Sequence, residues 1–206
     1  MRRKKDYEYE VIKKILTVVF MLAVLINEMR ENNIYATETT HIVTVYGVVQ
    51  AKSNWCWAAS AEMAGKVLYP TSGRDQWSAV HAIYGTTTDP YPNYAGTLSD
   101  SVTASEHIVY NNYDFYSIIN TWLFSQLDIE IENGHPVQTA GGYYSGNIRM
   151  GGHMVVTYLT RYNSSSDTYY IGYVDPFDGN AKYCTYDAFC DGTYNGRTFD
   201  QVVYTH

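Results

Sequence analysis

The hydrophobic pattern changes its period near residue 135, and this change constrains the fold more than any other feature of the chain. Before it, apolar residues recur at three- and four-residue steps, which predicts helices at 55–68, 77–84, 99–108 and 120–132. After it, apolar and polar residues alternate, which predicts strands at 136–140, 153–161, 168–175, 183–185 and 199–204, with a Gly-Gly turn after the first and a hairpin loop at 163–167. Helices followed by antiparallel strands predict an α+β fold with segregated halves and a groove between them.

The first 36 residues differ in composition from the rest of the chain. Six basic residues precede a run of 12 residues at 15–26 that is apolar except for Thr17, and a polar stretch then ends at Ala36. This order is typical of a secretory signal peptide, so we predict a signal peptide at 1–36 and a secreted domain at 37–206. The alternative is an uncleaved membrane anchor, although a run of 12 residues is short of the roughly 20 that a spanning helix needs.

The predicted domain is acidic. Residues 37–206 hold seven Lys and Arg against 16 Asp and Glu, which gives a formal charge of −9. Nucleic acid is therefore not expected as a partner, and the balance also disfavours an anionic substrate. Once the signal peptide is removed, no membrane contact is expected, and the sequence leaves the oligomeric state open.

All three cysteines lie in the predicted domain. An odd number in a secreted chain indicates one reactive thiol and a pair. Cys184 and Cys190 are either joined by a local disulfide or two buried reduced thiols, and the sequence does not decide between these. Cys56 is the unpaired cysteine on either interpretation.

Four residues spread along the chain occur in an order that suits thiol catalysis: Gln50, Cys56, His153 and Asp175. Cys56 falls in the first turn of a predicted helix, which Ser53 or Asn54 is placed to cap, and a helix N-terminus lowers the pKa of a thiol. His153 would act as the general base, and Asp175 would orient it from the other end of the same predicted hairpin. Asp178 is an alternative orienting residue.

The remaining role in such a site is stabilisation of the oxyanion. The side-chain amide of Gln50 and the backbone N–H of Cys56 are the expected donors. The other histidines match no metal-binding spacing, and no metal or organic cofactor is expected.

These residues resemble the papain-like cysteine peptidase superfamily over roughly residues 45–205. The chain is most similar to short secreted bacterial forms, namely the staphopains, plant-pathogen effector peptidases and relatives of bacteriocin-leader-processing peptidases. The resemblance rests on the segment Gln50-Ala51-Lys52-Ser53-Asn54-Trp55-Cys56-Trp57, on Gly151-Gly152-His153, on Asp175-Pro176 and on Gly134-His135-Pro136-Val137. It implies a papain-like fold with Cys56 as nucleophile, His153 as base, Asp175 as orienting residue and Gln50 as oxyanion donor.

The chain departs from papain in having Ser53-Asn54-Trp55 before Cys56, and Asp175 where papain has Asn. The expected function is that of a secreted cysteine peptidase acting on a protein or peptide. One alternative is a peptidoglycan amidase or endopeptidase with the same chemistry. The other is a catalytically idle surface binding module, suggested by the many tyrosines of the C-terminal half, among them Tyr143, Tyr169, Tyr183 and Tyr194.

Overall fold

Alternation along the strands places two hydrophobic cores on opposite faces of one antiparallel sheet. Met154 and Val203 pack into one core with the helices of the first half, whereas their neighbours Val155 and Val202 pack into the other. Successive side chains of a strand point to opposite faces, so a strand buried on both sides feeds both cores. This arrangement fixes which side of each strand faces the N-terminal helices.

The computed structural model describes residues 38–205, and the predicted signal peptide lies outside them. The sheet has the strand order β2-β7-β3-β4-β5-β6, and β1 pairs with the distal half of β4. The strands are β1 (Glu38–Ile42), β2 (Phe115–Ile118), β3 (Val137–Ser145), β4 (Ile148–Asn163), β5 (Thr168–Asp175), β6 (Asn180–Thr185) and β7 (Thr198–Thr205). All of these pairings are antiparallel.

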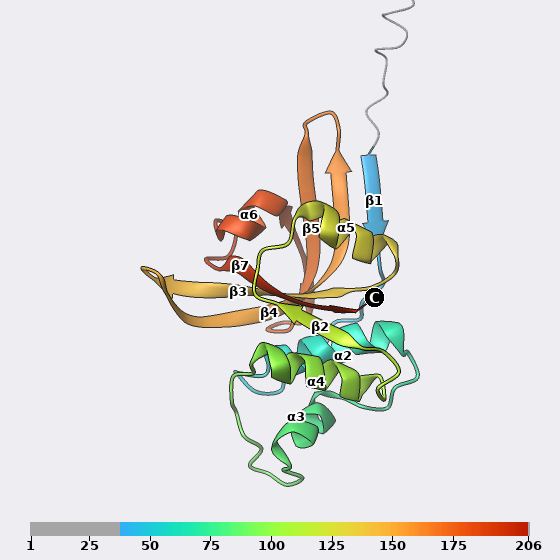
Figure 1. Ribbon diagram of the computed structural model, residues 1–206, viewed down its shortest axis with the longest axis vertical. Helices are drawn as coiled ribbons and strands as arrows, with labels where there is room; N and C mark the ends of the chain where they lie inside the picture. The colour runs from blue at the N-terminus through green and yellow to red at the C-terminus, as the bar shows by residue number, and fades with distance from the viewer. Residues whose placement is uncertain (1–37, 206) are drawn as a thin grey trace, which may run out of the picture. The chain divides into compact units, whose positions relative to one another are not determined.

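The helices cover the two faces of the sheet unequally. Figure 1 shows α2, α3 and α4 together on one side of the sheet, and α5 and α6 on the other. Their bounds are α2 (Cys56–Leu68), α3 (Gln76–Tyr84), α4 (Leu98–Ile108), α5 (Phe124–Glu132) and α6 (Tyr186–Asp191). The prediction of an α+β fold with a helical half followed by an antiparallel half is therefore confirmed.

Small residues let α2 lie close to its neighbours. Ala58, Ala61 and Ala64 are fully buried, and a Cβ atom at Gly65 would lie 2.5 Å from the side chain of Ile108 on α4. The Ser60 hydroxyl donates to the Met154 carbonyl at 3.2 Å and joins α2 to β4. Helix α2 is thereby held against β4 at Met154, the residue that follows His153.

Three local predictions were wrong, and three elements were missed. The Gly-Gly pair at 141–142 is not a turn, because β3 continues to Ser145. The pairing register of β3 shifts once against β4 and once against β7. The fourth helix begins at Phe124 rather than at residue 120. Neither Ser53 nor Asn54 caps α2, because their side chains bond to Asn93 instead. Strands β1 and β2 and the short helix α6 were not predicted.

Candidate active site

Cys56 is the first residue of α2, so its thiol lies at the positive end of the helix dipole. Trp55 occupies the N-cap position, and no side chain caps the helix. Backbone N–H groups of the first turn have no partner within a helix, so here they remain available to other acceptors. The N–H of Trp57 bonds to the Cys56 sulfur, as does the backbone of Met154 on β4.

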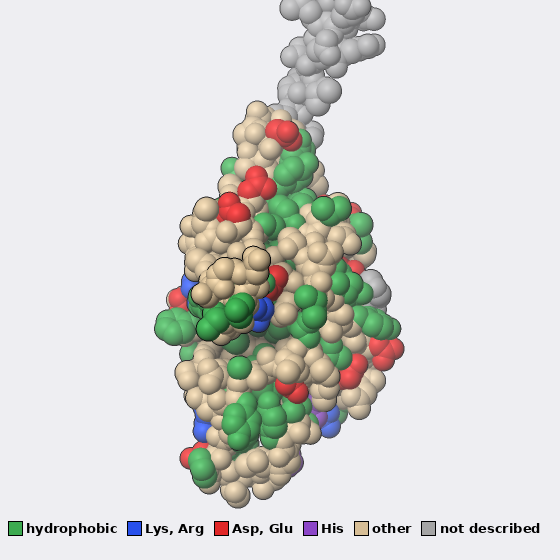
Figure 2. Space-filling model, turned by 60° about the vertical axis from the view of Figure 1, so that its left-hand side comes forward, with side chains coloured by type: hydrophobic (Ala, Val, Ile, Leu, Met, Phe, Trp, Pro, Cys, Tyr) green, Lys and Arg blue, Asp and Glu red, His purple; other side chains and the backbone are tan. Residues whose placement is uncertain are grey.

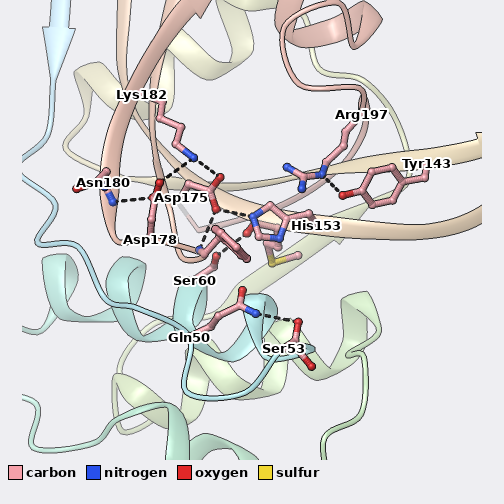
Figure 3. A network of polar contacts seen from close by, with 12 residues as sticks. Gln50, Ser53, Ser60, Tyr143, His153, Asp175, Asp178, Asn180, Lys182 and Arg197 are labelled. Carbon is pink, nitrogen blue, oxygen red and sulfur yellow. Dashed lines mark hydrogen bonds and ion pairs between the residues drawn. The ribbon is translucent and has the colours of Figure 1, made fainter.

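The β4–β5 hairpin brings His153 and Asp175 together. His153 lies on β4 just before the segment that pairs with β5, and Asp175 is the last residue of β5. His153 Nε2 lies 2.5 Å from Asp175 Oδ1, as Figure 3 shows. Since Nε2 is bound to Asp175, Nδ1 is left for the hydrogen bond between His153 and the Cys56 thiol. The three side chains form one continuous chain of hydrogen bonds.

Cys56 and His153 line a cleft of about 420 Å³ between the helical half and the sheet, whereas Asp175 is buried behind His153. Cys56 and Trp57 contribute from α2, Gly96 from the loop before α4, and His153 and Met154 from β4. Trp57 is buried, and a Cβ atom at Gly96 would lie 2.4 Å from its indole ring. Gly96 therefore allows the loop to lie flat on Trp57, which supports the wall of the cleft. The predicted groove between the two halves is present.

The pKa values of the pair shift in opposite directions. Burial by itself would raise the pKa of the Cys56 thiol, but the hydrogen bond and charge of His153 together with backbone donors outweigh it, and the pKa is lowered. Burial would lower the pKa of His153, but its hydrogen bonds to Asp175 and Cys56 raise it. Both shifts favour a thiolate beside an imidazolium, which is the reactive form of such a pair.

Asp175 is held ionised by three donors. Its carboxylate accepts from His153, from Lys182 Nζ at 2.7 Å and from the backbone N–H of Phe177 at 2.9 Å. Burial opposes ionisation, but these bonds lower the pKa of Asp175 strongly. The side chains of His153 and Asp175 are only 9% and 6% exposed, so the interaction is poorly screened by water.

Asp178, the alternative orienting residue, contacts Lys182 at 3.3 Å and the N–H of Asn180 at 3.0 Å (Figure 3). Both contacts lie on the far side of Asp175 from the imidazole. The residue that the structure places on His153 is therefore Asp175.

Gln50 reaches the cleft, but its amide is engaged within its own loop. Its Nε2 donates to the carbonyls of Lys52 at 3.0 Å and Ser53 at 2.8 Å. Its Oε1 is buried and has no hydrogen-bond partner within residues 38–205. The backbone N–H of Gln50 donates to the Pro176 carbonyl at 2.7 Å, so the loop before Cys56 is joined to the loop after Asp175.

Two supporting residues were missed by sequence reasoning. The Gln76 side chain accepts from the N–H of Ala51 at 2.8 Å and donates to the Val49 carbonyl at 3.0 Å, and so clamps the chain on both sides of Gln50. Lys182 pairs with Asp175, as described above. Neither residue follows a recognisable spacing in the sequence, since Gln76 is 26 residues from Gln50. Lys182 comes near Asp175 through the pairing of β5 with β6.

The other cysteines and Trp55 lie away from this chemistry. Cys184 and Cys190 are both free, so the disulfide alternative does not hold in this structure. Burial raises the pKa of Cys184 to about 11. Trp55 is fully buried with its indole N–H on the Pro92 carbonyl, and it therefore has no surface for stacking on a substrate.

A thiol, an imidazole and a carboxylate joined in this order at the start of a helix define the class of cysteine hydrolases. Residues 25–202 match the model of the Peptidase_C39 like family. The chain therefore belongs to this family. Comparison with curated proteins finds no match.

One similar solved structure is that of UfSP from C. elegans, at 11% identity and a TM-score of 0.41 over 83% of this chain. The chain spans about a third (34%) of the length of that protein. Within residues 38–205, no group of three or more His, Cys, Asp or Glu is placed to hold a metal ion, and no helix is long and apolar enough to cross a membrane.

Proposed function

We propose that the protein is a secreted peptidase that hydrolyses peptide bonds in a protein or peptide substrate through Cys56, His153 and Asp175. The observation that carries this proposal is that Cys56 and His153 line one cleft and are hydrogen-bonded to each other, while the buried Asp175 bonds to His153 Nε2. Export would use the predicted signal peptide at 1–36. Expression in a secreting host, followed by N-terminal sequencing, is expected to give a chain that begins at Thr37.

The geometry supports a two-stage reaction. The Cys56 thiolate attacks the peptide carbonyl, the C–S bond forms, and the carbonyl π electrons move to the oxygen. The protonated His153 then gives its proton to the leaving amine, the C–N bond breaks, and a thioester remains. Water attacks the thioester while His153 takes its proton, and the C–S bond then breaks, which releases the acid and restores the Cys56 thiolate beside the His153 imidazolium.

The substrate class is tested by offering two kinds of amide to the purified protein. We expect casein to be cleaved and a cell-wall suspension to remain turbid, because the cleft is an open groove between two halves of the domain and so admits an extended chain. Clearing of the cell-wall suspension with casein left intact would instead establish the peptidoglycan amidase or endopeptidase. Binding of either one without hydrolysis would establish the idle module.

We propose that Gln50 and the backbone N–H of Cys56 stabilise the oxyanion. Gln50 lines the cleft, and the N–H of the first residue of a helix has no partner within the helix. In this proposal one N–H of Gln50 turns from a loop carbonyl to the developing oxyanion, where a negative charge makes it the stronger acceptor.

Gln50→Ala is therefore expected to lower kcat roughly 100-fold with little change in KM, because the lost hydrogen bond forms mainly in the transition state. The measurement is steady-state hydrolysis of a fluorogenic peptide, with the rate of Cys56 alkylation as the control for an intact thiol. A raised KM with kcat unchanged would show that Gln50 only holds the loop at 50–53.

A further inference from the structure

The cleft is positively charged although the domain is acidic. The residues that line the cleft include no Asp or Glu, but they include both Arg149 and Arg197. On the face shown in Figure 2, Lys and Arg side chains form only small, separate patches among hydrophobic, uncharged and acidic surface. Two arginines in one cleft are thus a local exception to the charge of −9 over residues 37–206.

The two arginines differ in their partners. Arg149 forms an ion pair with Asp200, with Nε to Oδ2 at 2.8 Å and a second contact at 3.3 Å, so its charge is compensated. Arg197 forms no ion pair with any carboxylate of residues 38–205, and its Nε donates to the hydroxyl of Tyr143. The Arg197 guanidinium also lies 5.1 Å from the centre of the Tyr143 ring. Its charge is the uncompensated one.

Arg197 also lies beside the reacting groups. It lines the main cleft and a small hollow that His153 also lines. Figure 3 shows its terminal nitrogens on the side of the guanidinium that faces His153, with Nε turned to Tyr143. These terminal nitrogens present paired N–H donors, the geometry that binds a carboxylate with two parallel hydrogen bonds.

The backbone around Arg197 is built to hold this side chain. Asn195 Oδ1 accepts from the N–H of Arg197 at 3.0 Å and closes the turn that precedes β7. A Cβ atom at Gly141 would lie 2.9 Å from the Arg197 Cβ. The Gly141 position, predicted to be part of a turn, therefore leaves room for Arg197 on the sheet.

We infer that Arg197 binds a carboxylate of the peptide substrate, so that the enzyme prefers peptides with an acidic group close to the bond that is cleaved. This inference rests on the proposed peptidase function and deepens it. The carboxylate belongs either to an Asp or Glu side chain or to the free C-terminus of a peptide, and both present the same chemistry. The net negative charge of the domain does not prevent binding, because charges beyond a Debye length of about 8 Å are screened in physiological salt.

The test is a cleavage-site profile of the purified protein on a proteome-derived peptide library, followed by three matched peptides built on the preferred site. One carries Glu at the enriched position and an amidated C-terminus, one carries Gln and a free C-terminus, and one carries Gln and an amidated C-terminus. The peptide with the recognised carboxylate is expected to show a kcat/KM about tenfold above the neutral peptide, the size of one partly exposed charge-assisted hydrogen-bonded pair. Enrichment of Asp or Glu identifies a side chain, and cleavage at a fixed distance from the free end identifies the C-terminus.

Arg197→Gln is expected to abolish this preference, so that its kcat/KM for the peptide with the recognised carboxylate falls to its own value for the neutral peptide. Arg197→Lys keeps the charge and is expected to retain part of the preference, which separates a lost contact from a damaged fold. Arg161→Gln is the matched control, because Arg161 is paired with Glu38 at the end of β4 that pairs with β1, away from the cleft. It is expected to keep the full preference.

Equal cleavage of all three peptides by the unchanged enzyme, or an undiminished preference in Arg197→Gln, would overturn the inference. These results leave the proposed function standing, since hydrolysis is observed in both. If no peptide is cleaved and Cys56 does not react with a thiol-directed epoxide, the proposed function fails and this inference fails with it.

Discussion

Cys56→Ala is expected to fold normally and to lose at least about 10⁴-fold in peptide hydrolysis, because the substitution removes the thiol that forms the acyl-enzyme. Cys56 is half-buried and lies at the first position of α2, so loss of its sulfur leaves the buried face of the helix intact. The measurement is hydrolysis of a fluorogenic peptide, with circular dichroism and thermal unfolding as controls for the fold. Residual hydrolysis near the level of the unchanged protein would rule out Cys56 as the nucleophile.

The other two thiols provide the matched control. Burial raises the pKa of both Cys184 and Cys190, so neither forms an appreciable thiolate at neutral pH. A thiol-directed epoxide is therefore expected to label Cys56 alone, as read by mass-spectrometric mapping, and Cys190→Ala is expected to keep full activity. Labelling at Cys184 or Cys190 in preference to Cys56 would show that the Cys56–His153 pair is not activated.

Asp175→Asn is expected to lower kcat roughly 10- to 100-fold and to narrow the pH profile. The reactive form needs the Cys56 thiolate, whose pKa is lowered below the usual 9.0, and the His153 imidazolium, whose pKa is raised above the usual 6.5. Activity therefore rises as the pH passes the pKa of Cys56 and falls as it passes that of His153. Without the carboxylate, the pKa of His153 falls, so the alkaline limb moves to lower pH. A less stable imidazolium also raises the pKa of Cys56, so the acid limb of the profile moves to higher pH.

The profile is measured as kcat/KM against pH with one fluorogenic peptide. Asp178→Asn is the matched control: Asp178 shares Lys182 with Asp175 but does not contact His153. Its profile is expected to stay within about twofold of the unchanged enzyme at every pH. An alkaline limb that stays in place in Asp175→Asn would show that this carboxylate does not set the pKa of His153.

The periodicity of the sequence was sufficient for most elements of the fold. The steps of three and four in α2 and the alternation in β4 and β5 come from burial of one or two faces, which is a local constraint on sequence. The missed elements β1 and β2 are mostly exposed short strands, so they carry little hydrophobic pattern. The Gly141-Gly142 pair was taken for a turn because glycine marks turns and close approaches alike, and only the neighbouring arginines distinguish the two.

As with the fold, part of the candidate site could be predicted from the sequence and part could not. The order of Gln50, Cys56, His153 and Asp175 was visible in the sequence because each role admits only a few residue types, and the chain matches the Peptidase_C39 like family. The partners Gln76 and Lys182 were not visible, because many polar residues can serve as supports and their spacing follows from the packing of whole elements.

The sequence by itself determined the segregated α+β halves, the candidate nucleophile at a helix N-terminus and the order of the catalytic candidates, since periodicity and residue chemistry are written locally. Tertiary structure alone decided between Asp175 and Asp178 as the neighbour of His153, and it left Cys184 and Cys190 unbonded. It also placed an arginine that forms no ion pair within residues 38–205 in the cleft of an acidic domain, which net charge does not predict. Composition adds charges without regard to position, whereas a substrate responds to the few charges within a Debye length of it.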